Sequence, residues 1–154
     1  MKPVSALSLY LFAAVLAVAP TATLAVYSDP SPPVSNEHAA GKKALEAKDW
    51  NGAIKSLRAA VQRDSRNADI HNLLGYAYRN AGQVETAFKH YYWALQIDPQ
   101  HRGAHEYIGE AYLKAGNLAK AEEHLATLKR ICPASCEERD DLARSIDRHR
   151  AGGK

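Results

Sequence analysis

The chain has 154 residues, of which 46% are hydrophobic and 24% are charged, which is the size and composition of one soluble domain. Lys and Arg number 20 against 17 Asp and Glu, and the formal net charge of +3 is too small for a dedicated nucleic-acid binder. Two cysteines exclude a disulfide-rich scaffold and a zinc site made of four thiolates of one chain.

Residues 1–25 have the pattern of a secretory signal peptide. Lys2 opens the segment, an apolar stretch fills 6–19, and small residues follow as far as Ala25. We therefore expect cleavage after Ala25 and a periplasmic or secreted protein. The alternative is a retained membrane anchor, because the uncharged stretch 3–28 is long enough to cross a bilayer.

A proline-rich segment and an internal repeat follow. Three prolines in 26–33 predict an extended linker. From residue 34 onward the chain matches itself at a shift of 34 positions: 68–101 and 102–135 agree at ten positions, and 34–67 agrees with 68–101 at seven. A self-match at a fixed period indicates stacked copies of one small structural unit.

Each copy predicts two helices. In the middle copy, apolar residues recur at spacings of three and four over 70–78 and again over 84–97. Gly82 favours the left-handed cap that ends a helix, and the residue before Pro99 avoids helical angles. Gly75 is expected to face the small Ala87 on the second helix, so that the two helix axes approach closely.

The motifs of the middle copy are His71-x2-Leu74-Gly75-x2-Tyr78, Ala87-x3-Tyr91 and Pro99, and the third copy has His105-x2-Ile108-Gly109-x2-Tyr112, Ala121-x3-Leu125 and Pro133. They resemble the tetratricopeptide repeat signature. The resemblance implies an all-α, right-handed solenoid of three helix-turn-helix repeats, at 34–67, 68–101 and 102–135. A C-terminal capping helix at 136–150 would close the stack, since an end repeat needs a polar outer face.

This last helix has one narrow apolar stripe, formed by Leu142 and Ile146. Ser135 and Glu138 have the spacing of a capping box and are expected to begin the helix.

Cys132 and Cys136 lie just before it. In an exported chain a structural disulfide is expected. Free thiols, a metal site and a redox pair are the alternatives, although a redox motif normally has two residues between its cysteines.

Seven histidines suggest a metal site, because His101 and His105 have an i, i+4 spacing and Glu106 is adjacent. The repeat offers a simpler explanation, since four of the seven are two pairs 34 positions apart and stand where this family has packed aromatic residues. Neither a metal site nor a cofactor is predicted. Catalysis is not predicted either, because nucleophile-elbow, phosphate-loop and His-Glu-x-x-His motifs are absent from the sequence.

The resemblance implies a non-catalytic adaptor that binds a peptide or a partner segment in a concave groove formed by the first helix of each repeat. Mixed charges with a tyrosine suit a peptide or protein ligand. The expected solvent-facing groove residues are His38, Lys42, Asp69, Asn72, Tyr76, Arg79, Asn80, Glu106, Glu110 and Lys114. A solvated face without a ligand is the alternative.

Tyr92 and Trp93 suggest a second contact surface, because they occupy positions of the second helix that are usually polar in this family. They could instead pack on the third repeat or on the linker that follows the signal segment. Two other functions stay open: a metal- or redox-linked periplasmic accessory that uses the cysteines and histidines, and a scaffold that self-associates. The expected partner is a protein or peptide rather than a nucleic acid, and membrane contact is expected only through an uncleaved signal segment.

Overall fold

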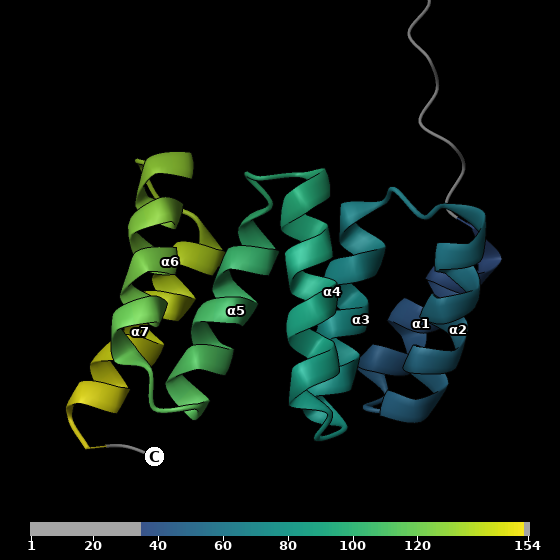
Figure 1. Ribbon diagram of the computed structural model, residues 1–154, viewed down its shortest axis with the longest axis horizontal. Coiled ribbons are helices and arrows are strands. Elements are labelled where there is room, and N and C mark those ends of the chain that lie inside the picture. The colour runs from purple at the N-terminus through teal and green to yellow at the C-terminus, as the bar shows by residue number, and fades with distance from the viewer. Residues whose placement is uncertain (1–34, 153–154) are drawn as a thin grey trace, which may run out of the picture. The chain divides into compact units, whose positions relative to one another are not determined.

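The computed structural model describes residues 35–152, which form seven α-helices joined by short turns (Figure 1). The predicted signal peptide and linker lie outside these residues. The helices are α1 (Asn36–Glu46), α2 (Trp50–Arg63), α3 (Ala68–Asn80), α4 (Val84–Ile97), α5 (Arg102–Lys114), α6 (Leu118–Ile131) and α7 (Glu137–Arg150).

Each helix packs mainly on its neighbours in sequence. The largest contacts are within the pairs α1–α2, α3–α4 and α5–α6, and the pairs contact one another through α2–α3 and α4–α5. The last helix, α7, packs against both α5 and α6. Helix pairs that contact mainly the adjacent pair form a solenoid, so the all-α solenoid predicted from the repeat is confirmed.

The turn inside each pair has the same conformation in all three copies. Lys48, Gly82 and Gly116 lie 34 positions apart and have positive φ angles of 56°, 80° and 74°. In each turn the amide of this residue bonds back three positions and the next amide bonds back five, which is the Schellman motif. The first copy therefore folds like the others although a lysine replaces the glycine.

Replacing Lys48 by glycine is expected to stabilise the fold by about 1 kcal/mol, because a side chain in the left-handed region is strained and glycine is not. The reciprocal change, Gly82→Ala, should cost a similar amount. Urea unfolding followed by circular dichroism measures both changes. Equal stability of wild type and Lys48→Gly would contradict the assigned turn.

Glycines at the same position of the second and third repeats, Gly75 and Gly109, pack against large buried side chains of other helices. A Cβ atom on Gly75 would lie 2.4 Å from ring carbons of Tyr91, and one on Gly109 would lie 2.6 Å from Leu142. The side chain nearest to Gly75 is thus Tyr91, one turn after the expected Ala87 on α4, and the missing side chain leaves room for a buried ring. At Gly109 the partner comes from α7, so this helix completes the core of the third repeat.

The predicted capping box at the start of α7 is wrong. The N-cap residue is Cys136, and its side chain makes no capping hydrogen bond. The hydroxyl of Ser135 donates instead to a carboxylate oxygen of Asp140, at 2.7 Å. Cys136 has the extended backbone of the N-cap residue, so Ser135 lies one position before the cap.

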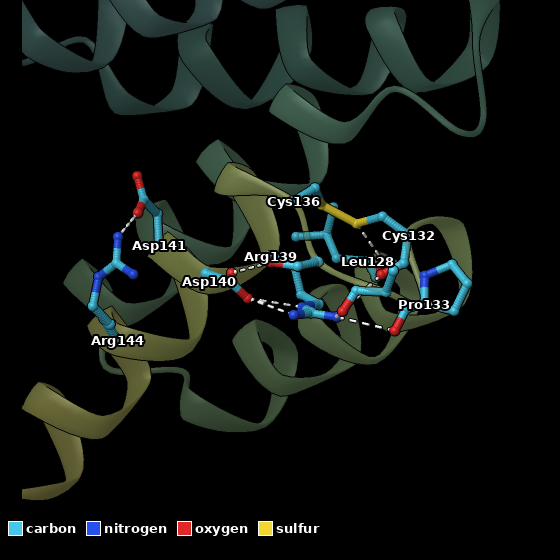
Figure 2. Close-up of polar contacts among 10 residues, drawn as sticks. Leu128, Cys132, Pro133, Cys136, Arg139, Asp140, Asp141 and Arg144 are labelled. Carbon is cyan, nitrogen blue, oxygen red and sulfur yellow. Dashed lines mark hydrogen bonds and ion pairs between the residues drawn. A yellow bond between two sulfur atoms is a disulfide. The ribbon is translucent and has the colours of Figure 1, made fainter.

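The loop between α6 and α7 is held by this disulfide and by one arginine (Figure 2). Cys132 and Cys136 are bonded, with a Cα–Cα distance of 6.1 Å. Arg139 lies on the first turn of α7 and donates to the backbone carbonyl oxygens of Cys132, Pro133 and Ala134, at 3.2, 3.2 and 2.9 Å. The guanidinium thus satisfies carbonyl groups that a helix end and a tight loop leave free.

Reducing the disulfide is expected to lower the free energy of unfolding by about 2 kcal/mol, the loop-entropy value for so short a ring. Urea unfolding with and without a phosphine reductant measures this. The Cys132→Ser, Cys136→Ser double variant is the control and should not respond to the reductant. An equal response of both proteins would contradict the disulfide.

Candidate functional site

The ten predicted groove residues all lie on the first helices of the pairs, α1, α3 and α5, and we call the surface that they share the first-helix face. Three of them are not solvent-facing, contrary to the prediction: His38, Asn72 and Arg79 are only 9%, 6% and 8% exposed. Packing between neighbouring helix pairs covers them. Lys42, Asp69 and Lys114 are exposed, and Tyr76, Asn80, Glu106 and Glu110 are half-buried.

Arg79 joins the second repeat to the third. Its Nη1 atom lies 2.6 Å from Oε2 of Glu110 and donates to the backbone carbonyl of Tyr107 at 3.4 Å. The guanidinium carbon lies 5.4 Å from the ring centre of Tyr76 and 5.3 Å from that of Tyr107, which is within cation–π range. This arginine is therefore part of the structure of the face, and a ligand would meet its neighbours first.

Glu106 lies between two ion pairs on α5. Arg102 one turn before it pairs with Glu138 of α7 at 3.6 Å, and Glu110 one turn after it pairs with Arg79. Glu106 has no side-chain hydrogen bond or ion pair within residues 35–152. Burial, followed by the nearby carboxylates of Glu110 and Glu138, raises its pKa to about 7.

Aromatic rings follow one another across the three repeats of this face. Trp50 and Tyr76 are 6.0 Å apart between ring centres in an edge-on contact, and Tyr76 and Tyr107 are 5.0 Å apart. The sequence analysis missed Trp50, Tyr107 and Glu138 as members of the site. Tyr107 was predictable, because it lies three positions before Glu110 and so shares its side of the helix. Trp50 and Glu138 reach the face through contacts between repeats, which the sequence does not reveal.

The histidines form two equivalent pairs between the helices of a repeat. Nδ1 of His71 lies 3.2 Å from Nδ1 of His90, and Nδ1 of His105 lies 2.9 Å from Nδ1 of His124. Nε2 of the first histidine in each pair donates to a backbone carbonyl oxygen, so its Nδ1 must accept from the second ring. These pairs have the packing role predicted for them.

The i, i+4 pair His101 and His105 does not converge on a metal. His101 accepts from the amide of Ala104 through Nδ1, as the N-cap of α5, and its Nε2 lies 3.0 Å from Asp69. His105 is engaged with His124 and with the carbonyl of Pro99. Within the described part of the chain, no three His, Cys, Asp or Glu side chains are grouped to hold a metal ion.

Acidification is expected to destabilise the fold through the histidine pairs. Burial, together with the neighbouring histidine, lowers the pKa of His90 and of His124 to about 4. An unfolded histidine titrates near 6.5, so the unfolded state binds more protons between these values, and stability is lost as the pH falls through this window. The loss should be about 1 kcal/mol for each pair, since both rings are partly exposed.

Urea unfolding at neutral and mildly acidic pH measures this loss. The comparison should use protein that carries Glu106→Gln. The raised pKa of Glu106 makes the folded state more stable as the pH falls, which would oppose the effect of the histidines. A His90→Phe, His124→Phe variant should lose most of the slope. An unchanged slope would contradict the assignment to the histidines.

The second predicted surface is both exposed and packed. Tyr92 and Trp93 are 43% and 47% exposed. The hydroxyl of Tyr92 lies 2.5 Å from that of Tyr112, so it does contact the third repeat, while Trp93 lies edge-on to His71 and His90. Both side chains lie on α4, outside the first-helix face, so we treat them as a separate surface.

Among residues 35–152, none of the helices combines the length and the apolar character needed to cross a membrane.

Comparison with known families agrees with this architecture. Two family models, both described as tetratricopeptide repeat, match residues 38–102 and 81–137. The chain belongs to the tetratricopeptide repeat family. No curated protein matches it in sequence.

Several solved structures have a similar fold. The tetratricopeptide domain of Sgt2 from Aspergillus fumigatus has a TM-score of 0.69 at 20% identity, covering 80% of this chain and 80% of that one. The second such domain of human RPAP3, in complex with the HSP70 peptide SGPTIEEVD, has a TM-score of 0.62 at 21% identity, covering 71% and 91%. The Yersinia enterocolitica secretion chaperone SycD, with a peptide of the translocator YopD, has a TM-score of 0.64 at 19% identity, covering 75% and 88%.

Proposed function

We propose that this protein is a non-catalytic interaction module that binds an extended segment of a protein partner across its first-helix face. The observation that carries the proposal is the connected set of aromatic and polar side chains on α3 and α5, which Trp50 at the start of α2 extends to the first repeat. Trp50, Tyr76 and Tyr107 supply apolar area, and Glu106 and Glu110 supply charge between them. A face built on packed helices loses little entropy on binding, so modest contacts give useful affinity.

The structural neighbours support the same proposal. RPAP3 and SycD are both solved with bound peptides, which shows that this fold accommodates such ligands in those proteins. The metal- or redox-linked alternative has less support, because His71, His90, His105 and His124 are engaged with one another and the cysteines are bonded together. We further propose, from the sequence of residues 1–25, that the chain is exported.

Selection from a displayed library of random dodecapeptides, followed by titration of the selected peptides, tests the binding proposal. The Tyr76→Ala variant should bind about tenfold more weakly than wild type, a typical cost for a central aromatic contact. Arg79 is left intact because it is buried. Tyr92→Ala is the matched control, an exposed tyrosine on α4, and should bind like wild type. Loss of binding in Tyr92→Ala but not in Tyr76→Ala would contradict a site on the first-helix face and indicate one on α4.

Export has a separate test. Fractionation of an expressing bacterial cell and N-terminal sequencing of the product should place a chain that begins at Val26 in the periplasm. A full-length product in the cytoplasm would contradict export without affecting the binding proposal.

A further inference from the structure

We infer that the first-helix face selects partner segments that present a lysine or arginine side chain, which Glu106 receives between the two ion pairs of α5. This inference rests on the proposed function and names the chemistry of the partner. Four further observations carry it.

The first is the charge balance along α5. Arg102, Glu106 and Glu110 are spaced four positions apart and therefore share one side of the helix. The outer two are paired across helices, with Glu138 of α7 and Arg79 of α3. Glu106 is the middle charge; its carboxylate forms no ion pair among residues 35–152, and the nearby charge of Arg79 offsets only part of the rise in its pKa.

The second is the surrounding chemistry. Burial raises the pKa of Glu106 to about 7, and the carboxylates of Glu110, Glu138 and Glu137 act in the same direction. A partner's negative charge beside Glu106 would be repelled by these carboxylates, whereas a partner's positive charge would reduce the repulsion among them. The rings of Tyr107 and Tyr76 lie within cation–π range of Arg79, so this part of the face already accommodates one basic side chain.

The third observation is a row of polar side chains, two of which have a buried atom without a hydrogen-bond partner. His38, Asn72 and Glu106 occupy the same position in the three repeats. Nε2 of His38 and Oδ1 of Asn72 have no hydrogen-bond partner, and these residues are 9% and 6% exposed. The amide nitrogen of Asn72 would lie 2.9 Å from a Cβ on Gly103, so Asn72 reaches α5 one turn before Glu106. An incoming backbone amide or ammonium group is the kind of donor that the oxygen of Asn72 lacks.

The fourth is a contrast with a structural neighbour. The peptide SGPTIEEVD in the RPAP3 complex carries adjacent acidic residues. If such a peptide bound across the first-helix face near Glu106 and Glu110, its carboxylates would meet like charges, which oppose binding at an interface. The carboxylates around Glu106 favour a basic segment over an acidic one.

The experiment uses dodecapeptides selected on the wild-type chain. Each is resynthesised with its conserved Lys or Arg replaced by Gln or by Glu and titrated by fluorescence anisotropy. The protein variants are Glu106→Gln, Glu106→Lys and Glu123→Gln, the last being an exposed glutamate of α6 as the matched control. Circular dichroism checks that each variant is folded.

We expect selected peptides to be enriched in Lys or Arg, and the Gln replacement to weaken wild-type binding about tenfold or more. The same replacement should change binding to Glu106→Gln little, and Glu106→Lys should prefer the Glu peptide. Peptides that need Tyr76 but bind equally with Lys or Gln would overturn this inference and leave the proposed function standing. An equal loss in Glu123→Gln would overturn it too, and failure to select any peptide would overturn both.

Discussion

Replacing Gly75 with valine should lower the free energy of unfolding by roughly 3 kcal/mol, the upper end of typical overpacking costs. A single Cβ at this position would already lie 2.4 Å from the ring of Tyr91, which is 0% exposed. Protein interiors are close-packed, so neither the ring nor α3 has space to move into. Thermal and urea unfolding measure the loss.

A graded series separates this clash from a general effect of substitution. Gly75→Ala should cost about 2 kcal/mol, although alanine favours helices over glycine by about 1 kcal/mol. Adding Tyr91→Leu to Gly75→Ala should recover part of the loss, because a shorter side chain vacates the space. Gly103→Ala is the matched control, since its Cβ would meet the end of the Asn72 side chain at 2.9 Å and His101 only at an ordinary contact distance of 3.5 Å. If Gly75→Ala and Gly103→Ala were equally stable, the assigned contact would be wrong.

Replacing Leu142 with alanine should cost about 3 kcal/mol, within the range for buried leucines. Leu142 is 0% exposed and fills the space that Gly109 leaves on α5. Ile146 is the other buried residue of α7, so the helix has few other apolar contacts to hold it. Urea unfolding measures the cost, with the half-buried Leu125→Ala of α6 as the control that should lose less.

Replacing Leu142 should also affect the candidate site. Glu138 lies on the first turn of α7 and pairs with Arg102 next to Glu106. If α7 loosens, hydrogen exchange in 137–150 should accelerate more than in α3. Uniform acceleration over all helices would contradict a separate role for α7 in closing the third repeat.

The fold was predictable because its information is local and repeated. The 34-residue period and the spacing of apolar residues predicted the helix pairs, and Gly82 and Gly116 have the left-handed angles expected of helix ends. The positions of the cysteines allowed the disulfide to be expected. These features depend on residues close in sequence or on the match between copies, and both can be read from the sequence.

The errors came from contacts between copies. Arg79 is expected to face solvent when α3 is considered alone, yet Glu110 and Tyr107 of the next repeat cover it. Gly109 receives Leu142 rather than a residue of its own pair, because α7 takes the place of a fourth repeat. Neither contact has a fixed spacing in the sequence, so periodicity could not predict it.

The most direct test of the binding site is a chemical-shift map of the ¹⁵N-labelled chain with a selected basic peptide. If the peptide binds at the first-helix face, the largest amide shifts should cluster on α1, α3 and α5 around Asn72, Tyr76, Glu106 and Glu110. They should be strongly reduced in Glu106→Gln and unchanged in Glu123→Gln. Shifts confined to α4 around Tyr92 and Trp93, with the first helices unperturbed, would contradict the account.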